Sequence, residues 1–148
     1  MKNNLLLLCC LMATGLFAQT AKTGDEILGV WITGTGKGKV EIFKKGDHYH
    51  GKIVWLKEPL NPKTNMPKTD LNHPNKTLHT RPLVGLQNLW GFSYKGDNTW
   101  GDGHIYDPNN GNEYKCVITM KDKNNIHVRG FLGIALIGRT DSWTRSKL

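Results

Sequence analysis

The chain has 148 residues, a length typical of one domain, and a formal net charge of +8. Its lysines are scattered along the sequence, whereas a nucleic-acid-binding protein gathers them into a stripe, so the composition does not favour nucleic acid as a partner. The positive charge fits a solvated surface, or attraction to the anionic lipid and polysaccharide surfaces of a cell envelope.

The first residues predict an export signal. Lys2 precedes an apolar run over residues 5–11, and the small residue Ala18 stands where cleavage is expected. The run is too short to cross a bilayer as a helix, which takes about 20 residues. We therefore expect a signal peptide over 1–18 and one soluble domain over 19–148, either periplasmic or secreted. The sequence does not decide between a periplasmic and a secreted location, and it does not indicate the oligomeric state.

Cleavage of the leader would remove two of the three cysteines and leave Cys116. An internal disulfide is then excluded, and the domain has to be held together by its core. Cys116 alternates in phase with Tyr114 and Ile118, which favours a small buried residue over a nucleophile.

A two-residue alternation of apolar and polar side chains dominates the rest of the chain, as in Val40 and Ile42 around Glu41. Short segments rich in glycine, asparagine and aspartate separate these runs and suit tight hairpins. The pattern predicts eight strands, at about residues 27–33, 39–45, 48–57, 83–94, 99–106, 112–120, 125–132 and 135–145.

One connection is much longer than the others. Residues 58–82 contain five prolines, which cannot donate to a sheet ladder, so this segment is predicted to be a loop between the third and fourth strands. Loops of this length usually have a function or are disordered. With short turns elsewhere, we expect an all-β, eight-stranded, antiparallel up-and-down barrel, because closure removes unpaired edges.

Several separate motifs carry a resemblance that covers nearly the whole mature chain. They are ILGVW over 27–31, GKIVWLKEP over 51–59, RPLVGL over 81–86, GHIYDP over 103–108, GNEY over 111–114, RGFLG over 129–133 and GRTDSWTR over 138–145. Together they resemble the exported bacterial family called domain of unknown function 2147. The resemblance implies a lipocalin-like (calycin) barrel in the envelope and implies no activity and no cofactor.

A thinner resemblance to lipocalins proper rests on Gly29 and Trp31 near the start and Arg145 near the end. It implies that the tryptophan closes one end of the barrel and that the guanidinium packs across its ring. Such a cation–π contact contributes about 0.5–2 kcal/mol. We expect these residues to have a structural role in barrel closure.

Aromatic side chains on the predicted strands are the candidates for a ligand site, because an eight-stranded barrel is either filled by side chains or holds one small ligand. Trp55 shares a predicted face with Ile53 and Tyr49, which makes it the first candidate for an interior wall. The full set of candidate ligand-binding residues is Tyr49, Ile53, Trp55, Trp90, Trp100 and Tyr114.

Three hypotheses for function follow. The first is a non-enzymatic protein that binds a small hydrophobic or amphipathic ligand inside the barrel. The second is an envelope accessory protein that binds a protein or polysaccharide through loop 58–82 and its basic surface. The third is a metal-dependent enzyme: His48 and His50 have a spacing that zinc sites use, but the sequence fixes no third ligand.

Overall fold

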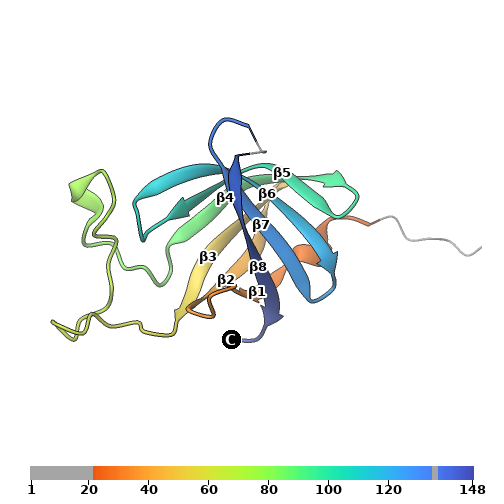
Figure 1. The fold of residues 1–148 in the computed structure, drawn as a ribbon. Helices are drawn as coiled ribbons and strands as arrows, with labels where there is room; N and C mark the ends of the chain where they lie inside the picture. The colour runs from red at the N-terminus through yellow and green to blue at the C-terminus, as the bar shows by residue number, and fades with distance from the viewer. Residues whose placement is uncertain (1–21, 135–136) are drawn as a thin grey trace, which may run out of the picture.

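The computed structural model describes residues 22–134 and 137–148, which form a closed barrel of antiparallel strands in sequential order (Figure 1). The strands are β1 (Gly29–Ile32), β2 (Gly38–Lys45), β3 (His48–Leu56), β4 (Gln87–Gly96), β5 (Thr99–Asp107), β6 (Asn112–Asp122), β7 (Asn125–Phe131) and β8 (Gly138–Ser146). The predicted fold class, an eight-stranded up-and-down barrel with almost no helix, is confirmed.

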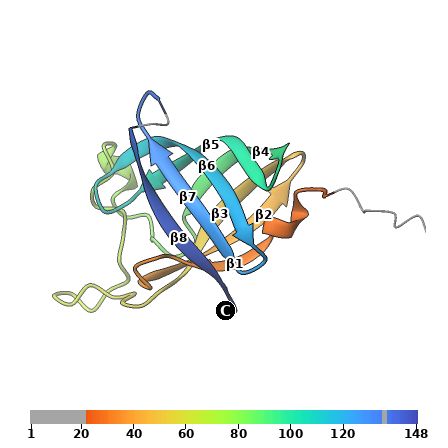
Figure 2. The same ribbon diagram turned by 45° about the vertical axis from the view of Figure 1, so that its right-hand side comes forward.

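Closure comes from the pairing of the first and last strands. Trp31 of β1 lies opposite Arg145 of β8, and every other strand pairs with its neighbour in sequence (Figure 2). Because the strands run alternately up and down, the connections after β1, β3, β5 and β7 all lie at the same end. We call this the loop end and the opposite end, where the chain enters β1, the closed end.

Three strands begin two or more residues later than predicted, whereas the other predicted limits agree with the structure within two residues. The segment Asp25–Ile27 forms a short 3₁₀ helix, η1, so β1 begins only at Gly29. Residues 83–86 form a turn, in which Gly85 has a positive φ of 93°, and β4 begins after it. The last strand begins at Gly138; the predicted positions 135 and 136 lie outside the described residues.

The interior is filled by side chains that alternate with exposed ones along the strands. The largest fully buried side chains include Trp31, Trp100 and Phe92, and they belong to one continuous core. Burial of apolar surface at about 25 cal/mol per Å² is the main stabilising contribution of such a core. The described residues contain no disulfide, since Cys116 is a free thiol, so this core has to supply the stability.

The long connection between β3 and β4 is folded rather than extended. It contains a second 3₁₀ helix, η2 (Lys76–Leu78), and two isolated bridges, Leu60 to Pro67 and Thr69 to Pro82. In Figure 1 it projects beyond the barrel as the yellow-green segment on the left. In the part of the chain that the structure describes, no helix has the length and apolar character needed to cross a membrane.

Candidate functional site

The closed end is sealed by Trp31 and Arg145. The guanidinium carbon of Arg145 lies 4.2 Å from the ring centroid of Trp31, which is the contact that the resemblance implies. Arg145 also donates to the backbone carbonyls of Glu26, Leu28 and Lys123 at 2.6–2.9 Å. Partial burial lowers the pKa of its guanidinium. These bonds hold the entering chain across this end of the barrel.

Gly29 lets the arginine approach. Its φ is 121°, in a region that other residues rarely adopt, and a Cβ there would lie 3.1 Å from Nη1 of Arg145. A side chain at this position would strain the backbone and crowd the guanidinium.

Two of the predicted ligand-binding side chains, Tyr49 and Trp100, use their polar atoms to hold the N-terminal segment. The Tyr49 hydroxyl donates to a carboxylate oxygen of Asp25 at 2.6 Å, and the Trp100 indole donates to the carbonyl of Gly24 at 3.1 Å. Both side chains are at most 2% exposed. Their packing gives them a structural role that needs no ligand.

The middle of the barrel is packed closely enough to require glycine. A Cβ on Gly103 would lie 2.3 Å from the ring of Phe92, and one on Gly51 would lie 2.8 Å from Leu89. Ile53, another predicted ligand-binding residue, is 6% exposed in the same core. The described residues therefore fill the centre of the barrel with their own side chains.

The expectation that Trp55 is an interior wall is wrong. The register of β2 and β3 shifts between Lys39 and Val40, so that Val40 lies opposite Ile53 but Lys39 lies opposite Trp55. A bulge of this kind moves the following side chain to the other face of the strand. Trp55 is accordingly 38% exposed, with the Lys39 ammonium 5.3 Å from its ring centroid.

The two remaining candidates are only half-buried, although Trp90 packs against the core. Trp90 is half-buried and stacks on His104 with ring centroids 5.6 Å apart. Tyr114 is half-buried near the start of β6, where its hydroxyl accepts from the side chain of Asn110. The six predicted residues are thus dispersed over the core, the outer surface and the rim.

The loop end contains an ion pair with a buried carboxylate and a partly exposed guanidinium, which the sequence did not single out. Asp70 of the long loop is completely buried and accepts from Nη2 of Arg81 at 2.5 Å and from the Tyr106 hydroxyl at 2.6 Å. The ring of His73 lies against Tyr106, with centroids 5.4 Å apart. A carboxylate without solvent needs such partners, because an unpaired buried charge costs several kcal/mol.

This cluster fixes the long loop to the outside of the barrel. In β5, Gly103 contacts the core ring of Phe92 and Ile105 faces the inward position of Gly130, so Tyr106 points outward. Tyr106 is nevertheless only 7% exposed, because loop residues cover it. Burial, followed by the hydrogen bond to Asp70, raises the pKa of its hydroxyl to about 12.

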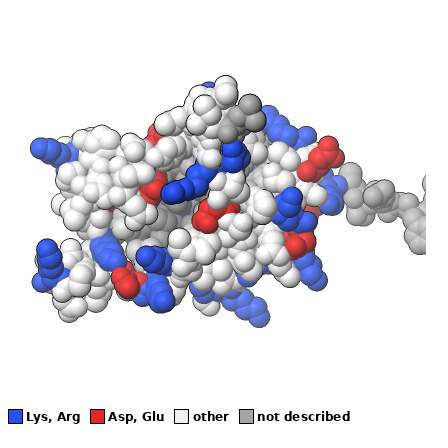
Figure 3. All heavy atoms as spheres, viewed as in Figure 1, with Lys and Arg blue, Asp and Glu red and all other residues white. Residues whose placement is uncertain are grey.

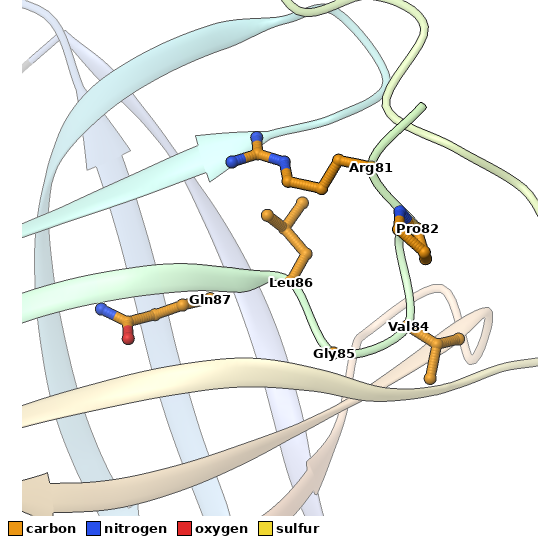
Figure 4. A pocket seen from close by; sticks show the side chains of 6 residues that line it. All are labelled: Arg81, Pro82, Val84, Gly85, Leu86 and Gln87. Atoms are coloured by element: carbon orange, nitrogen blue, oxygen red, sulfur yellow. The ribbon is translucent and has the colours of Figure 1, made fainter. Parts of the chain in front are cut away.

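Beside this cluster the surface has an open depression with a volume of about 370 Å³ (Figure 4). It is lined by Arg81, Pro82, Val84, Gly85, Leu86 and Gln87. In Figure 4 the side chains of Arg81 and Leu86 converge, whereas Val84 and Gln87 point away from them. A cationic group thus lies at the edge of a depression whose lining is partly polar and partly apolar, which suits an amphipathic anion.

The two histidines proposed as weak metal ligands have other partners. A ring nitrogen of His48 lies 3.2 Å from the Ser93 hydroxyl, and one of His50 lies 3.3 Å from the amide of Gln87. The pKa of His50 is lowered mainly by desolvation, and further by the charges of His48 and Lys45. Within residues 22–134 and 137–148, no group of three histidine, cysteine or acidic side chains could hold a metal ion.

Cys116 should resist thiol reagents in the folded protein. It is 1% exposed, and burial raises the pKa of its thiol to about 12, so the reactive thiolate is scarce at pH 8. In the chain without residues 1–18, Ellman's reagent should therefore titrate one thiol in denaturant and almost none in buffer. Rapid reaction of the native protein would contradict this packing.

The residues of the depression were missed as a site because they belong to the end of an irregular loop. The sequence did offer one signal, since the motif RPLVGL over 81–86 contributed to the family resemblance. No such signal pointed to Asp70, because a single aspartate among prolines and asparagines cannot be distinguished from an ordinary turn residue.

Comparison with known proteins gave two matches. The family model described as "Uncharacterized protein conserved in bacteria (DUF2147)" matches residues 29–145. Among solved structures, the chain is similar to protein HP1028 from Helicobacter pylori, which is described as belonging to the lipocalin family. The TM-score is 0.69 at 18% identity, over 81% of this chain and 82% of that one, which supports the fold alone. A comparison with curated proteins found no match.

Proposed function

This chain belongs to the DUF2147 family, and from that premise we propose that it is an exported, non-catalytic protein that binds a small amphipathic molecule at the loop end of its barrel. The observation that carries the proposal is the depression beside Arg81, which combines a cation with apolar walls. The signal peptide that the sequence predicts over residues 1–18 supports export to the periplasm or beyond.

The loop end is favoured over the barrel interior because of how each is packed. The interior is filled by side chains, whereas the depression is open and about 370 Å³ in volume, near the lower limit for small-molecule sites. Arg81 uses one amino group for Asp70, but its side chain is still 35% exposed, so it can meet an anionic head group. Val84, which is 45% exposed, offers the main contact to an apolar tail, because Leu86 is only 6% exposed.

Isothermal titration with dodecanoate, an apolar chain with a carboxylate, tests the proposal. We expect saturable binding at one site per chain, and Val84→Asp should weaken it about tenfold by removing an apolar contact and adding a like charge. Val84 is 45% exposed, so the substitution should leave the fold intact.

Leu71→Asp is the matched control. Leu71 belongs to the same loop and is 57% exposed, but it does not line the depression. Its substitution should leave dodecanoate binding unchanged. Absence of binding by the unmodified chain, or equal losses in the two variants, would exclude the depression as the site.

A further inference from the structure

We propose that the outer wall formed by β2 and β3 binds an anionic polysaccharide, with a row of lysines meeting its acidic groups and Trp55 packing against a sugar ring. This wall lies outside the depression, and the inference does not depend on the proposed ligand. Three observations support it: lysines gathered on one face, aromatic rings among them, and a composition that suits a sugar polymer.

The β2–β3 hairpin gathers on one face lysines that are scattered in the sequence. Val40 and Ile42 are buried, so the residues next to them in β2 face outward. The register shift between β2 and β3 puts Trp55 in the same outward row, opposite Lys39. A backbone hydrogen bond from residue 57 to residue 37 continues the ladder beyond β2. The outward row holds five lysines, which we call the lysine strip: Lys37, Lys39, Lys45, Lys52 and Lys57.

Most of the positive charge of the lysine strip is unpaired. Glu41 is the one acidic residue in β2 and β3, and it forms a salt bridge with Lys52 at 3.0 Å. The other four lysines of the strip form no salt bridge with any other described residue. In Figure 3 lysine and arginine side chains outnumber acidic ones along the lower edge of the molecule, the side on which β1, β2 and β3 lie in Figure 1. The wall therefore attracts a polyanion.

Two aromatic rings lie among these lysines. Trp55 is 38% exposed, and the Lys39 ammonium lies 5.3 Å from its ring centroid. Phe43 is half-buried, with the Lys52 ammonium 5.6 Å from its centroid and the His50 ring stacked on it at 5.7 Å. Each ring thus holds an ammonium group beside an apolar surface. An acidic sugar unit has the matching pair of groups, a carboxylate and an apolar C–H face.

The composition of the wall favours a polymer over a bilayer or a protein. On β2 and β3, every residue of which the structure describes, Trp55 is the one exposed large apolar side chain, so no apolar cluster can insert among acyl chains. Lysine is depleted in protein interfaces, whereas it dominates this wall. From Lys37 to Lys45 the strip extends over about 26 Å, at about 3.3 Å per residue. An extended chain with acidic groups along its length can meet these lysines one after another.

A polysaccharide also suits the wall better than single-stranded nucleic acid. Successive bases stack on successive aromatic faces, which have to be free. The Phe43 ring is already stacked by His50, and the Trp55 ring has the Lys39 ammonium over it. The exposed part of Trp55 is therefore one platform, which is enough for one sugar ring but not for a series of bases.

Fluorescence anisotropy of labelled oligogalacturonate, a linear polymer of acidic sugars, tests the inference with the chain lacking residues 1–18. We expect saturable binding that weakens as salt is added, because salt screens exposed charges, and no binding to labelled neutral dextran. The double variant Lys37→Glu/Lys45→Glu reverses exposed charges at the two ends of the strip and should weaken binding at least about tenfold. Trp55→Ala should weaken it about fivefold, by removing an apolar contact without a change of charge.

Lys115→Glu/Lys121→Glu is the matched control. Both lysines are exposed on β6, which lies four strands from β2 in either direction around the barrel, and the two double variants change the net charge equally. The control should bind oligogalacturonate as the unmodified chain does. Equal losses for the two double variants would reduce the effect to net charge and overturn the proposal. Failure of the unmodified chain to bind, or tighter binding of single-stranded DNA than of oligogalacturonate, would overturn it too.

Discussion

Replacing Asp70 with alanine should lower the melting temperature of the protein by about 10 °C and release the 57–86 loop from the barrel. The Asp70 carboxylate is fully buried and joins the guanidinium of Arg81 to the hydroxyl of Tyr106. Its removal leaves both groups without their partner in a partly desolvated site. The expected loss of stability is about 3 kcal/mol, which is large against a total of about 5–15 kcal/mol.

Two measurements distinguish release of the loop from general destabilisation. Thermal unfolding followed by circular dichroism gives the melting temperature, and limited trypsin digestion reports cleavage after Lys68. In the intact loop the backbone of Lys68 bonds to Pro59 and Leu83, which protects this site. We expect faster cleavage there in the Asp70 variant at temperatures well below unfolding.

Asp47→Ala is the control, since Asp47 is an exposed turn residue at the closed end. The melting temperature of Asp70→Asn should lie between those of Asp47→Ala and Asp70→Ala, because an amide keeps the shape of the carboxylate but loses its charge. If Asp70→Ala melts at the temperature of Asp47→Ala, the ion pair does not hold the loop.

The Asp70→Ala substitution should also change the titration of Tyr106. Burial and the Asp70 hydrogen bond raise its pKa from about 10 to about 12, so the folded state keeps this proton longer than the unfolded state. The resulting stabilisation is present below pH 10 and is lost as the pH rises from about 10 to about 12. In Asp70→Ala the tyrosinate absorbance assigned to Tyr106, by difference from Tyr106→Phe, should appear at lower pH.

The barrel could be predicted from the sequence because its determinants are local. Alternation fixes which side chains face inward, and turn residues such as Gly46 and Asp97 fix where each strand reverses. Errors arose where the alternation is broken. The bulge beside Trp55 and the turn around Gly85 each depend on pairing with a neighbouring strand, which a single segment does not reveal.

The candidate site was not predictable in the same way, because it depends on contacts between distant residues. Asp70, Arg81 and Tyr106 are separated by up to 36 positions, and two of them lie in a loop with no periodicity. The predicted ligand-binding residues were therefore mostly aromatic, because large aromatic side chains can be recognised in the sequence without knowledge of distant contacts. Most of that aromatic surface serves the core, where Trp31, Trp100 and Trp143 are at most 3% exposed.

Replacing Trp31 with alanine should lower the free energy of unfolding by about 3–5 kcal/mol, a cost typical of deleting a fully buried aromatic side chain. Trp31 is completely buried, and its indole N–H donates to the carbonyl of Ile27 at 2.9 Å. The guanidinium of Arg145 stacks on its ring. The variant loses all three contributions and leaves a cavity at the closed end. Urea denaturation followed by circular dichroism measures the change.

Trp55→Ala makes the same deletion at a position that the β2–β3 bulge turns toward solvent, where 38% of the side chain is exposed and Lys39 lies over the ring. For this variant we expect the free energy of unfolding to fall by about 1 kcal/mol or less. A double-mutant cycle of Trp31→Leu with Arg145→Met removes the ring and the cation in turn, and should give a coupling energy of about 0.5–2 kcal/mol for the cation–π contact. Equal losses for the two alanine variants would mean that Trp31 is not a fully packed part of the barrel core.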